Sequence, residues 1–288
     1  MQIVDFDVDL VRIPGWEQFG WLRHGFSTRF GGVSSVYKQE GGPDELNLGW
    51  TKEDDPRLVA ENRRRFAGAV GGDVSGNGGL ALVTVAQIHS ATVQAVGKDD
   101  GAAEGLLQTA EGKAVLRGDG LVTGVPGVLL GIQTADCVPV MVVDTKKRVV
   151  GVFHAGWRGT VAGIVEAGVA QMGERYGSRG EDLVAAVGPS IGQCCYSVGQ
   201  EVREALEARY RYAGDLFSRN LEGAERLDLW EANRRQLVEA GVSAEKIAVV
   251  GECTACTVVA GGRKRYFSHR GERGFTGRMM SAVGIVGD

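Results

Sequence analysis

The amino-acid sequence predicts an α+β fold, and three observations support this. Short apolar segments come in runs and do not alternate strictly with helical patterns, which argues against a doubly wound parallel sheet. The connections between these segments are mostly short, as in hairpins. No internal repeat and no shift in composition marks a boundary, so we expect residues 1–288 to form one layered domain.

The first helix is expected at residues 54–70, after a long turn-rich loop at 28–50. Asp55 is the expected N-cap and Pro56 the first helical residue. The glycine-rich segment 71–80 then forms a connector. Glycine makes up 45 of 288 residues, about twice the usual share, which indicates many tight turns.

Short apolar runs bounded by turn residues predict the strands. The expected strands are 81–88, 92–96, 120–123, 128–134, 138–143, 149–153, 183–187 and 247–250, with a late strand around Phe267.

Three further helices are expected at 159–177, 197–210 and 228–242. Ser197 is the expected N-cap of the second of these helices, which has apolar residues at helical spacing. Gly241 is expected to close the third as its C-cap.

Charge and composition exclude several classes of partner. The net charge of −4 gives no general reason to bind nucleic acid or an anionic membrane, and no protein partner can be inferred. The first residues lack the basic region of a signal peptide, and no apolar run reaches the ~20 residues of a membrane span. We therefore expect a cytoplasmic protein whose five cysteines are mostly reduced.

Two histidines and one cysteine lie at the ends of predicted strands. They are His89 in QIHSATV, Cys137 in TADC and His154 in FHAGWRG. Two imidazoles and a thiolate can hold Zn²⁺ with one position open to water or substrate. The spacings of 48 and 17 residues match no local metal motif, so these side chains would have to converge in space. A second hypothesis needs no metal and makes Cys137 a nucleophile activated by His154.

Taken singly, these residues also have ordinary explanations. A histidine at a strand end is more often a hydrogen-bonded core or rim residue, and a cysteine in an apolar strand is usually a small hydrophobe. Asp136 is harder to explain, because a carboxylate is rarely buried without a partner. In a regular strand Asp136 and Cys137 would point to opposite faces, whereas a break or bulge near Pro139 would let both reach one pocket.

Two arginines are candidates for binding an anion. Arg29 stands where a predicted strand gives way to glycine, and Arg158 follows His154 by four residues where a helix begins. A guanidinium beside a helix N-terminus suits a phosphate. Most arginines are nevertheless ordinary surface residues.

The other four cysteines are Cys194, Cys195, Cys253 and Cys256. Cys253 and Cys256 form a C-x-x-C, but a second C-x-x-C at zinc-ribbon spacing is missing, and Cys194–Cys195 is an adjacent pair. A redox dithiol would require a thioredoxin-like context that is not evident. We therefore expect structural thiols and no zinc site from these four residues.

The motifs together resemble the YfiH-like family, whose members are called laccase-domain or multicopper polyphenol oxidase proteins and purine nucleoside phosphorylases. The matching pieces run from Arg23 to Ser281 and include QIHSATV, GIQTADCVPV, HAGWRGTVAG, GPSIGQCCYSVGQEV and FSHRGERGFTGRMMS. The resemblance implies a layered sandwich of mixed sheets flanked by helices, likened to cysteine-hydrolase folds. It also implies a zinc site from His89, Cys137 and His154.

The resemblance further implies phosphorolysis of adenosine, inosine, guanosine and methylthioadenosine, with hydrolytic deamination of adenosine. In this interpretation Arg29, Arg158 and Asn47 bind substrate or phosphate, and Asp136 carries a proton. The loop segment 35–45 looks longer than is usual in the family, and a loop covering the pocket would change the substrate range.

Three alternatives remain. The first is a peptidoglycan-editing amidase that removes L-serine from a UDP-muramoyl precursor with the same centre. The second is a copper-dependent polyphenol oxidase, for which four histidines are too few to hold several coppers. Zinc is therefore the expected metal and copper the less favoured one. The third is a nucleoside-binding module without catalysis.

Overall fold

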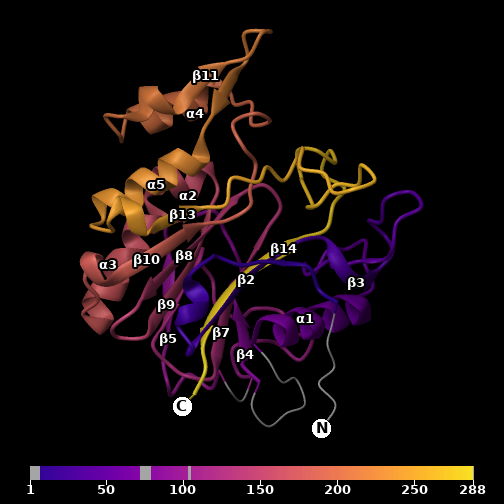
Figure 1. Ribbon diagram of the computed structural model, residues 1–288, viewed down its shortest axis with the longest axis vertical. Coiled ribbons are helices and arrows are strands. Elements are labelled where there is room, and N and C mark those ends of the chain that lie inside the picture. Colours follow the sequence, from indigo (N-terminus) through magenta and orange to yellow (C-terminus); the bar gives the residue numbers. More distant parts are fainter. Residues whose placement is uncertain (1–6, 72–78, 103–104, 288) are drawn as a thin grey trace.

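The core of the fold is built from two large β-sheets packed face to face, with helices on both outer faces (Figure 1) and a separate two-stranded sheet beside them. The computed structural model describes residues 7–71, 79–102 and 105–287. One sheet has six strands in the order β13-β10-β8-β9-β6-β5, and the other has five in the order β1-β2-β14-β7-β4. Both sheets mix parallel and antiparallel pairs. The predicted α+β class and layered arrangement are confirmed.

The strands are short and mostly buried. Their bounds are β1 (Leu10–Val11), β2 (Leu22–Ser27), β3 (Phe30–Ser34), β4 (Ala81–Thr84), β5 (Val93–Val96), β6 (Gly120–Thr123), β7 (Val128–Thr134), β8 (Val138–Asp144), β9 (Val149–Ala155), β10 (Leu183–Val187), β11 (Phe217–Arg219), β12 (Glu225–Leu227), β13 (Ile247–Val249) and β14 (Met279–Ile285). The α-helices are α1 (Pro56–Gly71), α2 (Trp157–Ala162), α3 (Ile164–Tyr176), α4 (Gln200–Glu207) and α5 (Leu229–Glu239).

Alternation along β8 shows how the six-stranded sheet separates two cores. Val140 and Val142 face outward and join the core formed with α3 and α5. Met141 and Val143 face inward and join the core between the two sheets. Because side chains in a strand alternate between faces, one continuous apolar run fills both cores. Helix α1 covers the outer face of the five-stranded sheet through a third cluster that includes Phe66.

Several predicted elements are confirmed at or close to their expected bounds. Strands 120–123, 128–134 and 183–187 are found at their expected bounds. Asp55 precedes α1 as expected, and its side chain accepts the backbone N–H of Arg57 at 2.8 Å. Residues 72–78 of the expected connector lie outside the described residues.

Four predicted elements need correction. The strand expected at 81–88 ends at Thr84. The helix expected at 159–177 is divided at Gly163, whose φ of 80° interrupts the helical backbone. Helix α4 begins after Gly199, without side-chain capping by Ser197. The late strand does not surround Phe267. It is β14, which pairs with β2 and β7.

The topology brings several strand ends to one edge of the two sheets. The β7–β8 turn, the end of β9 and the segment that follows β4 all line the same pocket. Within the described part of the chain, no helix has the length and apolar character needed to cross a membrane.

Candidate active site

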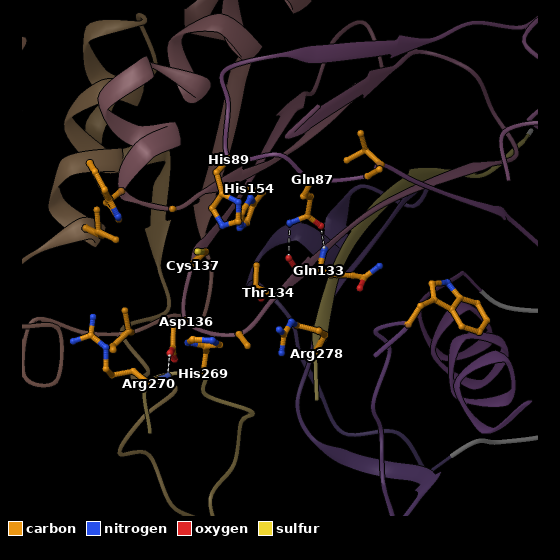
Figure 2. A pocket seen from close by; sticks show the side chains of 18 of the residues that line it. Gln87, His89, Gln133, Thr134, Asp136, Cys137, His154, His269, Arg270 and Arg278 are labelled. Carbon is orange, nitrogen blue, oxygen red and sulfur yellow. Dashed lines mark hydrogen bonds between the residues drawn. The ribbon is translucent and has the colours of Figure 1, made fainter. Parts of the chain in front are cut away.

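A pocket of about 790 Å³ opens where these strand ends meet (Figure 2). Its lining combines aromatic side chains with a polar set. The polar and ionisable members labelled in Figure 2 are Gln87, His89, Gln133, Thr134, Asp136, Cys137, His154, His269, Arg270 and Arg278. A few polar groups converging in a partly apolar cavity are typical of small-molecule sites.

His89, Cys137 and His154 converge at one wall of this pocket (Figure 2). His89 lies on the segment after β4, Cys137 ends the β7–β8 turn, and His154 lies in β9. One possible ligand atom from each residue lies within 4.8 Å of the other two. Two imidazoles and a thiolate, with the pocket on their open side, fit a three-ligand zinc site that leaves one position free.

Asp119 forms hydrogen bonds with both histidines of this cluster. Its Oδ1 lies 2.8 Å from Nδ1 of His154 and accepts the backbone N–H of His89 at 2.9 Å. Its Oδ2 accepts the backbone N–H of Ser90 at 2.6 Å. Burial raises the pKa of Asp119, but the hydrogen bonds from His154 and Ser90 outweigh it and lower this pKa to about 2. The carboxylate therefore fixes the ring of His154 with Nε2 left for a ligand.

The charges of Cys137 and His154 stabilise each other. Burial raises the pKa of Cys137, but the charge and hydrogen bond of His154, with help from His89, lower it to about 6. Burial lowers the pKa of His154, yet Cys137 and Asp119 together raise it to about 9. The thiolate is the form of cysteine that acts as a metal ligand or as a nucleophile. This arrangement therefore suits Cys137 to both roles.

The backbone is strained on both sides of the cluster. His89 has a φ of 58° and Asp136 a φ of 89°, values that non-glycine residues adopt at a cost. At Asp136 this conformation ends the extended run, so Asp136 and Cys137 both line the pocket. Of the two arrangements considered for the sequence, the broken strand is the one observed.

The carboxylate of Asp136 is fully engaged. Oδ1 accepts the hydroxyls of Thr254 at 2.7 Å and Ser268 at 2.6 Å, and Oδ2 accepts the backbone N–H of Arg270 at 2.6 Å. These contacts tie the TADC turn to two later segments of the chain. They also place the side chain of Arg270 at the pocket.

Arg29 does not reach the pocket. It is fully buried, and its guanidinium donates to Glu45 at 2.7 Å and to Glu272 at 3.1 Å and stacks over Phe267. An anion could reach this guanidinium only by displacing a buried carboxylate. The phosphate-binding role expected for Arg29 therefore does not fit its position. Its ion pairs with Glu45 and Glu272 instead connect loops that are distant in the sequence.

Arg158 and Asn47 also lie outside the lining. Arg158 is exposed and stacks over Trp157 at 4.3 Å, on the six-residue helix α2. Asn47 is buried, and its Oδ1 accepts the backbone N–H of Arg278 at 2.9 Å. Asn47 thus positions a pocket arginine and does not itself face the cavity.

Several site residues were not singled out from the sequence. Arg270 and Arg278 are the arginines that line the pocket. Gln87 and Gln133 are joined by two hydrogen bonds of 2.7 and 2.8 Å between side chain and backbone. Asp119 had a usable signal, because it is a carboxylate between two glycines at the start of a buried strand. The places of the other residues at the pocket depend on long-range folding, which no local sequence pattern predicts.

The segment 35–45, although long, contributes none of the pocket residues identified in the described part of the chain. Its residue Tyr37 packs instead against Phe267 and Phe275. We expected this loop to cover the pocket and change the substrate range, but no direct contact between the loop and the pocket supports that expectation.

Comparison with known proteins gives consistent results. Residues 23–286 match the family described as multi-copper polyphenol oxidoreductase laccase. The chain is 38% identical to the purine nucleoside phosphorylase YlmD of Geobacillus stearothermophilus, over 93% of this chain and 95% of the relative. It is 37% identical to adenosine deaminase RL5 of an unknown prokaryotic organism, over 88% and 92%. The crystal structure of a hypothetical protein YfiH from Bacillus licheniformis superposes with a TM-score of 0.80 and 34% identity, over 96% of each chain.

Proposed function

Because this chain belongs to the multi-copper polyphenol oxidoreductase laccase family, which includes the YfiH-like proteins, we propose that it is a purine nucleoside phosphorylase that also deaminates adenosine. The observation that carries this proposal is the convergence of His89, Cys137 and His154 at the wall of a pocket. Relatives named for each activity match nearly the whole chain. We further propose that residues 1–288 form one functional domain.

The proposed cofactor is Zn²⁺, held by His89, Cys137 and His154. A zinc ion at this position would supply Lewis-acid polarisation and would activate water near neutral pH. Asp119 orients the ring of His154 for this purpose, as carboxylates behind zinc-bound histidines commonly do. Copper is the less favoured metal, since laccase chemistry requires several coppers.

The pocket arginines are the proposed phosphate ligands. Phosphorolysis needs an anion held against C1′ of the ribose while the purine leaves, and a guanidinium can bind phosphate through two hydrogen bonds. Arg278 already donates to the backbone carbonyls of Thr276 and Gly277 at 3.0 Å. These contacts hold its side chain in place, and Asn47 holds its backbone.

The aromatic lining is the proposed binding surface for the purine. Trp50, Trp157 and Tyr196 line the pocket, and aromatic rings stack well on a purine. Asp136 positions Arg270 through its backbone contact. The carboxyl of Asp136 accepts hydrogen bonds from three residues, so we assign it a positioning role in preference to proton transfer. Adenosine, inosine, guanosine and methylthioadenosine are the proposed substrates.

The experiment combines metal analysis of the purified protein with adenosine turnover, and the turnover is followed with and without phosphate. Adenine formed only with phosphate reports phosphorolysis, and inosine formed without phosphate reports deamination. Cys137→Ala is expected to abolish both activities and to lower the zinc content. Full activity with zinc lost would refute the metal proposal and favour Cys137-independent chemistry.

His24→Gln provides a control, because His24 is a buried histidine outside the pocket. This variant is expected to keep its zinc and its turnover. If the wild-type protein forms neither product, the phosphorylase proposal fails. Release of L-serine from a UDP-muramoyl substrate would then identify the amidase, and tight nucleoside binding without turnover would identify a binding module.

A further inference from the structure

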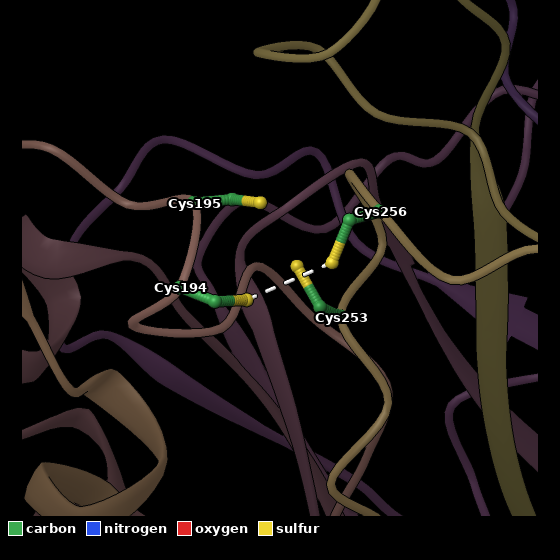
Figure 3. Close-up of side chains that lie close together, drawn as sticks. All are labelled: Cys194, Cys195, Cys253 and Cys256. Carbon is green, nitrogen blue, oxygen red and sulfur yellow. Dashed lines mark hydrogen bonds between the residues drawn. The ribbon is translucent and has the colours of Figure 1, made fainter.

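The four cysteines outside the active site converge on one point. Cys194 and Cys195 lie after β10, and Cys253 and Cys256 lie after β13. Strands β10 and β13 are parallel neighbours, so both segments leave the sheet at the same edge. The four sulfur atoms all lie within 4.8 Å of one another, and Figure 3 shows them facing the space between the two segments.

We propose that Cys194, Cys195, Cys253 and Cys256 together bind one Zn²⁺ ion. Four thiolates in a tetrahedron are a standard closed zinc site, with Zn–S distances near 2.3 Å. Tetrahedral geometry then places neighbouring sulfurs about 3.8 Å apart, and the Sγ atoms of Cys194 and Cys256 are 3.7 Å apart. A disulfide needs about 2.05 Å, so the observed spacing matches ligands of one ion and not a bonded pair.

The surrounding backbone is arranged as it is around bound thiolates. Each cysteine pair lies on a tight turn, closed by the N–H of Cys195 on Gly192 and by the N–H of Thr257 on Cys253. The N–H of Gly192 also donates to Sγ of Cys253 at 3.2 Å. Such hydrogen bonds stabilise negative charge on sulfur.

Two cations lie on these turns as well. Arg226 donates to the carbonyl of Cys194, and Lys264 donates to the carbonyl of Ala255. Four thiolates and one Zn²⁺ carry two excess negative charges, which these cations partly offset. The adjacent pair Cys194–Cys195, which argued against zinc in the sequence, becomes compatible with it because both sulfurs reach the same point.

The position gives the ion a structural role beside the pocket. Tyr196 follows Cys195 and lines the pocket, and Thr254 lies between the other two cysteines and donates to Asp136. An ion bound by all four thiols would clamp the segment of Tyr196 to the segment of Thr254. This four-thiolate site does not depend on the purine chemistry.

Zinc content per chain tests the proposal. Cys256→Ser is expected to contain one zinc fewer than the wild-type protein, measured by mass spectrometry of the metal. Cys137→Ser is the matched control, since it makes the same change at the other cluster and is expected to keep the four-thiolate zinc. X-ray absorption of this control should then show four sulfur ligands at about 2.3 Å.

Several results would overturn the proposal. They are an unchanged zinc content in Cys256→Ser, nitrogen or oxygen ligands in the absorption data, iron in place of zinc, or a disulfide among these cysteines by mass spectrometry. If Cys256→Ser fails to fold, cobalt substitution of Cys137→Ser replaces it. The tetrathiolate proposal then requires intense thiolate-to-cobalt absorption, and its absence refutes the site.

Discussion

The Nδ1 atom of His154 lies 2.8 Å from Oδ1 of Asp119, in a pair that is almost completely excluded from solvent. The same carboxylate accepts the backbone N–H of His89. One side chain thus orients the ring of His154 and fixes the backbone of His89, two proposed zinc ligands that are far apart in the sequence.

Asp119→Asn is expected to weaken zinc binding. The amide keeps the volume but loses the charge that orients His154, and such changes behind a metal ligand typically cost about 10–100-fold in metal affinity or activity. Competition with a chelating dye measures the affinity. Asp144→Asn is the control, since this buried carboxylate caps the turn after β8. Equal zinc affinity in Asp119→Asn and wild type would contradict the assigned role.

Gly156→Ala is expected to damage the site through a single methyl group. Gly156 has a φ of −68°, which alanine adopts without strain. An added Cβ would lie 2.8 Å from Sγ of Cys137, closer than carbon and sulfur can approach. Lower zinc occupancy and at least roughly tenfold lower turnover are expected. Gly214→Ala, where an added Cβ meets no atom within 4 Å, should leave both unchanged.

Arg278→Met is expected to raise the KM for phosphate by at least about tenfold, because it removes a charge-assisted contact to the anion. Adenosine deamination without phosphate should change much less. Arg158→Met is the matched control, because Arg158 is exposed and outside the pocket lining. A larger effect on phosphate KM from Arg158→Met than from Arg278→Met would refute this assignment.

Asp136→Asn is expected to destabilise the protein by on the order of 1–3 kcal/mol. The new NH₂ group is itself a donor, so it cannot accept the hydrogen bonds that the carboxylate oxygen accepts. The backbone N–H of Arg270 donates one of these hydrogen bonds. Turnover should fall, but the pH profile of kcat should keep both of its limbs if Asp136 only positions its neighbours. Loss of one limb in the variant would restore the proton-transfer role.

His24 is expected to make the protein less stable in mild acid. Burial lowers the pKa of His24 to about 4, whereas an unfolded histidine has a pKa near 6.5. The unfolded state therefore binds more protons between these values, and the free energy of unfolding falls as the pH drops through this window. From pH 7 to pH 5 the contribution of His24 falls by about 2 kcal/mol.

Urea unfolding of the wild type and of His24→Gln at both pH values measures this contribution. The variant should lose less stability than the wild type on acidification, by that amount. Glu61 and Glu231 have pKa values near 2. Their contributions to the free energy of unfolding are therefore lost mainly below the pH values that are compared. Identical pH dependence in the two proteins would exclude His24 as the cause.

The sequence was sufficient for the central strands and for singling out the three residues that converge at the pocket. Strands such as β7 and β10 are short apolar runs that stay buried in any packing, so their local pattern decides their structure. His89, Cys137 and His154 stand at the ends of such strands, and strand ends meet at the edges of sheets.

Long-range pairing and buried charge were beyond the reach of local patterns. Arg29 has the same local signal as a surface arginine, and only its contact with Glu45 shows that it belongs to the interior. Cys194 and Cys256 are 62 positions apart, and their meeting depends on the adjacency of β10 and β13. The run Met279–Ile285 is apolar and buried like β7, but its place between β2 and β7 depends on pairing across more than a hundred residues.

The place of β14 has a consequence for biosynthesis. This strand lies between β2 and β7 in the five-stranded sheet, yet it follows every other strand along the chain. A ribosome therefore releases β2 and β7 long before the strand that joins them, and their facing edges stay unpaired in the meantime. Such edges readily pair with other chains. We expect nascent chains that stop short of residue 279 to need chaperone protection, while addition of β14 closes the sheet.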